Sequence, residues 1–82
     1  MRIQIKLFGP EAAAAGTRVV PLDIPGEQAT PRAIRHVALQ RYPQLREQLT
    51  ACRFAVNHEF VSDDFSIHET DEVALIGRVS GG

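Results

Sequence analysis

The sequence contains little that would support an enzyme active site or a cross-linked fold. Its 82 residues include one cysteine, Cys52, one tyrosine and no tryptophan. A single cysteine excludes an internal disulfide and suits a reducing compartment, so we expect a cytoplasmic protein. No apolar run approaches the roughly 20 residues of a membrane-spanning helix, and the alternating start "MRIQIKLF" differs from a signal peptide. We therefore expect no membrane partner.

Charge limits the partners further. The formal net charge is −1, which gives no electrostatic basis for nucleic-acid binding, so we expect no nucleic-acid partner. Residues 54–77 nevertheless hold six acids and neither lysine nor arginine. Two interpretations remain open, namely a solvated acidic loop and an acidic surface that meets a basic partner.

The residue types that carry catalytic chemistry are scattered. His36, His58 and His68 stand far apart, without a second ligand at zinc-binding spacing. Cys52 is interpreted as a semi-buried hydrophobe rather than a reactive thiol. The segment "GPEAAAAG" lacks the spacing of a phosphate-binding loop. We expect no metal and no bound cofactor, and a chain that is not catalytic alone.

Hydrophobic periodicity predicts an α+β domain. Strict alternation over 2–8 and β-branched residues over 17–24 indicate two strands, and Pro21 makes the second either an edge strand or one that carries a bulge there. Thr30 and Pro31 mark the start of the main helix, because threonine suits the N-cap and proline the first helical position. Pro43 interrupts that helix, and a short second turn is expected after it. The remaining expected segments are strands at 53–57, 60–62 and 72–79, about one helical turn within 9–16, a connection at 25–29 and a loop at 63–71.

These elements predict a mixed sheet of four to five strands with one main helix on one face. Period-2 alternation places Phe8, Ala74 and Ile76 on the opposite face, which has no second helix to cover it. An uncovered apolar patch commonly marks a binding surface. The alternative, that long loops cover this face, stays open.

The chain ends in two glycines, which leave the terminal carboxylate of Gly82 on the least hindered backbone available. A backbone without Cβ atoms fits a narrow channel and adopts whatever path the channel requires. The carboxylate would become reactive if a partner converted it to a mixed anhydride with a nucleotide. The other interpretation is a frayed terminus of no consequence.

Several segments together resemble the ubiquitin-like β-grasp sulfur carriers. They are "GPEAAAAGT", the "TP" helix start, "FAVNHEFV" and "DEVALIGRVSGG", and the resemblance covers essentially all 82 residues. Within this family the similarity is greatest to the small subunits of molybdopterin synthases. The resemblance implies a β-grasp domain over residues 1–78 and an extended, flexible tail over residues 79–82.

The resemblance also implies a function. A partner enzyme would use ATP to adenylate Gly82, a sulfur donor protein would help convert it to a thiocarboxylate, and the large catalytic subunit of molybdopterin synthase would receive the sulfur. That sulfur would enter the dithiolene formed on a cyclic pterin precursor. The tail residues that would thread into the large subunit are Val79, Ser80 and Gly81. The residues that would form the docking patch are Phe8, Ala74, Ile76 and Arg78.

One departure from the family leaves the pathway open. The family often has two prolines where this chain has Gly77 and Arg78, a change that loosens the tail and adds a charge. The same chemistry could serve thiamin thiazole, another sulfur-containing metabolite or a tungsten-type pterin. Two other classes remain, namely a ubiquitin-like modifier joined through Gly82 to a target lysine, and a binding module whose tail is irrelevant.

Overall fold

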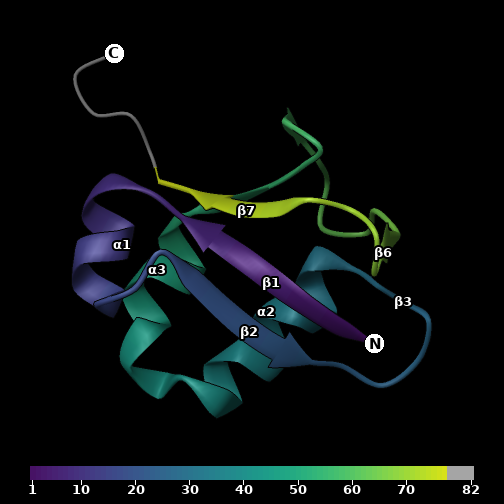
Figure 1. Ribbon diagram of the computed structural model, residues 1–82, viewed down its shortest axis with the longest axis horizontal. Coiled ribbons are helices and arrows are strands. Elements are labelled where there is room, and N and C mark those ends of the chain that lie inside the picture. The colour runs from purple at the N-terminus through teal and green to yellow at the C-terminus, as the bar shows by residue number, and fades with distance from the viewer. Residues whose placement is uncertain (78–82) are drawn as a thin grey trace.

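The computed structural model describes residues 1–77, and Arg78 together with the predicted tail at 79–82 lies outside the described residues. Within residues 1–77, helices pack against one face of a five-stranded mixed sheet (Figure 1). In chain order the elements are β1 (Arg2–Leu7), α1 (Gly9–Ala15), β2 (Val19–Asp23), β3 (Gln28–Ala29), α2 (Pro31–Arg41), η1 (Pro43–Leu45), α3 (Arg46–Ala51), β4 (Arg53–Val56), β5 (Glu59–Phe60), β6 (Ile67–His68) and β7 (Val73–Ile76).

Strand β7 lies in the middle of the sheet, whose strand order is β2-β1-β7-β4-β5. It runs parallel to β1 and antiparallel to β4, while β1 and β2 pair antiparallel. This is a ubiquitin-like β-grasp fold, so the predicted α+β class and sheet size are confirmed. The strand that leads toward the tail is therefore held by a neighbour on each side.

The core lies between the sheet and the helices. Alternate residues of β1 point into it, and Ile3, Ile5 and Leu7 are each no more than 3% exposed. Phe54 of β4 and Ile34 of α2 are buried with them. Each fully buried side chain of this size contributes roughly 1.5–3 kcal/mol relative to an exposed one. The alternation over 2–8 thus predicted which face of β1 is buried.

Helix α2 begins where the sequence predicts. The Thr30 hydroxyl accepts a hydrogen bond from the backbone N–H of Ala33 at 3.1 Å, and Pro31 is the first helical residue. The helix ends at Arg41 because Tyr42, which precedes a proline, leaves the helical conformation. The chain then continues through η1 and α3, which is more helix than the short turn predicted there.

A two-stranded pairing that the sequence did not predict lies beside the main sheet. Strands β3 and β6 pair antiparallel, with Ala29 opposite Ile67. Both fall in segments predicted as a connection, 25–29, and a loop, 63–71. Two residues are too few to show a hydrophobic period, so only the tertiary contact reveals the pairing.

Three further boundaries differ from those predicted. The tight turn after β4 places Val56 opposite Glu59, so β5 begins before the predicted strand at 60–62. Strand β7 spans Val73–Ile76, so Glu72 and Gly77 lie outside the strand predicted at 72–79, and residues 78–79 of that prediction lie outside the described residues. Helix α1 has 7 residues rather than about one turn, because its alanines continue the helix as far as Gly16, which adopts φ 72° and ends it.

Candidate functional site

The face of the sheet opposite the helices carries an apolar cluster in residues 1–77, in which Ala55 and Ala74 are buried at 8% exposure each and Ile76 is half-buried between exposed phenylalanines. Cross-strand register places its members side by side, since Ala55 of β4 lies opposite Ala74 of β7 and also opposite Phe60 of β5. Phe8 and Phe60 are 53% and 54% exposed. We call this cluster the open-face patch, and it consists of Phe8, Ala55, Phe60, Ala74 and Ile76.

Three predicted docking residues belong to the open-face patch. Phe8, Ala74 and Ile76 line one shallow groove, as their shared face of the sheet predicts. The fourth, Arg78, lies outside the described residues. The alternative that loops cover this face is wrong for residues 1–77, because Phe8 remains more than half exposed. A role for these residues in docking stays a prediction.

The sequence analysis missed two members of the patch, Ala55 and Phe60. A signal for Ala55 existed in the alternation of "RFAV", because Phe54 and Val56 turn into the core and the residue between them must turn outward. Phe60 could be placed only from the pairing of β4 with β5, which sets it opposite Ala55.

Charged side chains border the patch. Lys6 Nζ lies 3.5 Å from Glu72 Oε1, and His58 Nε2 lies 3.4 Å from Glu72 Oε2. The Arg53 guanidinium carbon lies 4.3 Å from the centroid of the Phe60 ring. An apolar centre within a polar rim is the usual anatomy of a protein–protein interface.

A tight turn at Asn57 and His58 joins β4 to β5. Both residues have positive φ, 51° and 71°, which is uncommon for residues other than glycine. Asn57 is fixed by its contacts, because its backbone N–H donates to the Glu72 carbonyl at 2.8 Å and its side-chain oxygen accepts from the Glu72 N–H at 2.9 Å. The turn is therefore tied to the start of β7.

Asp71 fixes the loop between β6 and β7. Its carboxylate accepts hydrogen bonds from the backbone N–H of His68 at 2.8 Å and from the Asn57 side-chain amide at 3.1 Å. These bonds, the backbone one first, lower the pKa of Asp71 because they stabilise its ionised form. The carboxylate thereby helps to position the strand that leads to the tail.

Gly77 occupies a crowded position directly after β7. A Cβ at this position would lie 2.5 Å from Glu11 Oε2 and 2.6 Å from Glu11 Oε1, closer than real Cβ contacts. Glu11 stands in the first turn of α1, where the helix dipole favours a carboxylate. The Glu11 oxygens are the far end of a flexible side chain that can turn aside at little cost, so the contact does not by itself require glycine at this position.

The acidic segment 54–77 pairs largely with bases of this chain. Asp63 lies 3.5 Å from Arg35 and Asp64 lies 3.3 Å from Arg32, so both acids contact the first turns of α2. Glu72 pairs with the bases that border the patch. Four of the six acids therefore lie within 4 Å of a basic side chain, namely Asp63, Asp64, Asp71 and Glu72, while Glu59 and Glu69 form no such ion pair within residues 1–77.

Cys52 is a core residue, as the interpretation of it as a hydrophobe predicts. It is 5% exposed, and burial raises the pKa of its thiol. The thiolate is the nucleophilic form of cysteine, so the site disfavours reactivity. Within residues 1–77, no three His, Cys, Asp or Glu side chains are grouped to hold a metal ion. The helices in that part of the chain are too short or too polar to cross a membrane.

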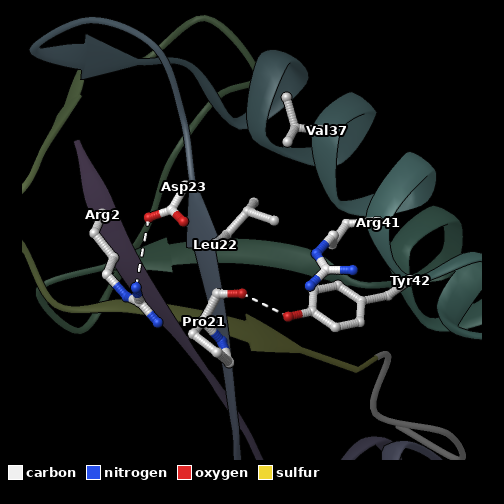
Figure 2. Close-up of a pocket in the computed structure, with 7 residues that line it drawn as sticks. All are labelled: Arg2, Pro21, Leu22, Asp23, Val37, Arg41 and Tyr42. Atoms are coloured by element: carbon white, nitrogen blue, oxygen red, sulfur yellow. Dashed lines mark hydrogen bonds and ion pairs between the residues drawn. The ribbon is translucent and has the colours of Figure 1, made fainter.

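A second hollow lies at the outer edge of β2 (Figure 2). The Tyr42 hydroxyl donates to the Pro21 carbonyl at 2.8 Å, and Arg2 lies 3.8 Å from Asp23. Pro21 has no N–H, so this part of the strand offers neither a free donor nor a free acceptor to an incoming strand. The hollow therefore belongs to the protection of a sheet edge.

The comparisons with known proteins cover nearly the whole chain. The ThiS family matches residues 5–82, which include both terminal glycines. The molybdopterin synthase sulfur carrier subunit of Dictyostelium discoideum is 32% identical over 87 residues, which cover 99% of this chain and 96% of that protein.

Two solved structures share the fold. SAMP1 from Haloferax volcanii superposes with a TM-score of 0.82 at 27% identity, over the full length of both chains. The complex of subunits 1 and 2 of the molybdopterin-converting factor from Helicobacter pylori contains a chain that superposes with a TM-score of 0.70, also over both full lengths. At 22% identity, this second similarity establishes the fold alone.

Proposed function

This chain belongs to the ThiS family, and we propose that it is a sulfur carrier that acts as the small subunit of a molybdopterin synthase. One observation carries the proposal: the similarity to a named sulfur carrier subunit is full-length, and the family match extends through Gly82. The alternative of a binding module whose tail is irrelevant does not explain why the family match includes both glycines.

The proposed chemistry takes place on Gly82. Its carboxylate attacks ATP in an activating enzyme, which releases pyrophosphate and leaves an acyl adenylate. A hydrosulfide equivalent from a donor protein then displaces AMP, so that a C–S bond replaces the C–O bond to phosphate and a thiocarboxylate results. In the large subunit the thiocarboxylate sulfur bonds to the pterin precursor, and water then cleaves the acyl C–S bond, which leaves the sulfur on the pterin and restores the carboxylate of Gly82.

The fold would present this tail and dock the partner. Strand β7 is held between β1 and β4, which fixes the point from which the tail starts. The open-face patch offers an apolar surface beside that point, since Ile76 is both a patch residue and the last residue of β7. The H. pylori subunit 1 in its complex with subunit 2 supports a large-subunit partner for this chain.

The direct test is the mass of the untagged chain after incubation with ATP, a molybdopterin synthase activating enzyme and a sulfur donor. We expect a gain equal to one sulfur in place of one oxygen, localised to Gly82 by fragmentation. A chain without Gly81 and Gly82 is the control and should gain nothing. A chain extended past Gly82 by a short tag should fold normally and fail to support synthase turnover. Full turnover by the tagged chain would overturn the carboxylate mechanism.

A protein modifier is the second candidate, because SAMP1 is named as a small archaeal modifier protein and superposes over the full chain. In that case Gly82 would form isopeptide bonds with lysines of other proteins. Digestion of native-cell proteins and a search for lysines that carry the C-terminal peptide of this chain would separate the two candidates. Thiamin thiazole synthesis is a second destination for the sulfur, and a different partner protein would identify it.

A further inference from the structure

Arg53 holds a distinctive position on the open face. It lies on β4 opposite Ile76, and its guanidinium stacks over the Phe60 ring at 4.3 Å. Its side chain forms no ion pair with any other residue between 1 and 77. Stacking on an aromatic ring restrains the guanidinium while its N–H groups stay available. Arg53 is therefore an oriented cation at the border of the open-face patch.

Two further bases border the same surface. Lys6 lies beside Ala74 in the parallel pairing of β1 with β7, and His58 follows β4. Both contact the single carboxylate of Glu72, at 3.5 and 3.4 Å. Glu72 is the one acid that lines this groove in residues 1–77, so Arg53 adds a positive charge that Glu72 does not balance.

The turn at Asn57 and His58 holds the His58 side chain at the border of the patch. A two-residue hairpin loop with positive φ at both positions is a type I′ turn, so the connection from β4 to β5 accounts for the φ values of 51° and 71°. Glycine would adopt the conformation of His58 without cost. The His58 side chain is 82% exposed and contacts Glu72, so it is accessible to a partner.

We infer that the open-face patch docks a partner surface whose apolar centre is bordered by carboxylates, with Arg53 as the principal carboxylate contact and Lys6 and His58 beside it. The inference rests on the proposed function, because the partner is the large synthase subunit. Arginine binds a carboxylate through two parallel hydrogen bonds and is enriched among the residues that dominate interface energies. Complementary charge also accelerates association. The sequence left open an acidic surface on this chain that meets a basic partner. The inferred contact has the opposite arrangement, with the bases on this chain and the acids on the partner.

The test measures association of the untagged chain with the large molybdopterin synthase subunit of the same organism, by stopped-flow at low and high salt. We expect Arg53→Glu to weaken binding roughly tenfold, mainly through slower association, and salt to weaken wild-type binding. The matched control is Arg46→Glu, which reverses an exposed charge on α3, away from the open face, and should stay within about twofold of wild type.

The outcomes separate the inference from the proposed function. If the wild-type chain does not bind the large subunit, the proposed function fails. If it binds and Arg53→Glu binds equally well or more tightly, the function stands and the inference is wrong. A dimer of the chain alone that Arg53→Glu separates would make a second copy the occupant of the face and would also overturn it.

His58→Gly tests one of the bases that border the open-face patch with a variant that we expect to fold. Relief of the positive φ should raise the Tm by about 4 °C while association with the large subunit slows. A variant more stable than wild type cannot lose binding through misfolding, so slower association assigns the loss to the missing side chain. Unchanged association at a raised Tm would remove His58 from the docking surface.

Discussion

Two phenylalanines on adjacent strands each have an arginine guanidinium over the ring. The two pairs differ in burial and in the face of the sheet on which they lie. Phe54 on β4 is 1% exposed, and the Arg35 guanidinium lies 5.0 Å from its ring. Phe60 on β5 is 54% exposed, with Arg53 at 4.3 Å. The first pair faces the helices and the second faces away from them.

The hydrogen bonds of the two arginines explain the difference. Arg35 donates to the carbonyl oxygens of Leu49 and Cys52 at the end of α3 and also to the Asp63 carboxylate. Its guanidinium therefore has partners within the fold. The donors of Arg53 form no ion pair within residues 1–77. The same pairing of residue types therefore stabilises the domain on one face and prepares a contact on the other. Substitutions should separate the two faces by what they damage.

The largest effect is expected for Phe54→Ala, which removes a fully buried ring from the covered face. Loss of the ring and the cavity that remains should lower the free energy of unfolding by about 3–5 kcal/mol. Urea denaturation followed by circular dichroism measures this. A loss below about 1.5 kcal/mol would show that the neighbouring side chains collapse into the space.

Arg35→Ala comes next, because it leaves the carbonyl oxygens of Leu49 and Cys52 without their shared donor. We expect a loss of about 1–3 kcal/mol in the free energy of unfolding. Arg53→Ala is the matched control on the other face and should cost no more than about 0.5 kcal/mol. Equal losses for the two variants would contradict the assignment of Arg35 to the fold and Arg53 to the surface.

Phe60→Ala should damage binding rather than folding. Its ring is more than half exposed, so we expect a stability loss below about 1 kcal/mol together with roughly tenfold weaker binding to the large subunit. Titration calorimetry gives the affinity, and denaturation of the same sample gives the stability. Intact binding would exclude Phe60 from the docking surface.

Cys52→Ala should have a modest effect, and on stability alone. Replacement of a small buried side chain is expected to cost about 1 kcal/mol. Thiocarboxylate formation and sulfur transfer should stay close to wild type, because the proposed mechanism places the sulfur on Gly82 rather than on the thiol. In the wild-type chain, burial and the raised pKa should make alkylation of Cys52 slow at neutral pH. A folded Cys52→Ala chain without sulfur transfer would reverse this assignment.

The smallest effect is expected from Asp71 and depends on pH. Hydrogen bonds lower the pKa of Asp71 in the folded state. Its stabilising contribution is therefore fully present above the ordinary aspartate pKa of about 4, and it is lost as the pH falls through the lowered pKa of the folded state. Asp71→Asn should therefore be less stable than wild type at neutral pH, and the difference should shrink in acid. A difference that stays constant between neutral and acidic pH would show that ionisation of Asp71 does not contribute.

Much of the fold could be predicted from the sequence because its signals are local. Alternation identified β1 and its buried face, Thr30 and Pro31 marked the start of α2, and Pro21 marked an edge strand. The pairing of β3 with β6 could not be predicted, because two-residue strands carry no period and are fixed by contacts distant in sequence, such as Asp71 with Asn57.

The candidate site was predictable in part for the same reason. Phe8, Ala74 and Ile76 share a face by alternation alone, whereas Phe60 required the strand register. Arg35 of α2 was not identified from the sequence, yet it reaches across to the end of α3 and its side chain is only 21% exposed. The long uncharged part of the arginine side chain lets the guanidinium reach α3, and the hydrophobic pattern of the helix does not indicate this contact.

The central position of β7 has a consequence during synthesis. The pair β2-β1 and the pair β4-β5 meet only through β7, so the inner edges of β1 and β4 have no partner until residues 73–76 have left the ribosome. A chain interrupted earlier would present two open strand edges, which favour aggregation and degradation. A chain truncated before β7 therefore cannot close the sheet that fixes the start of the tail.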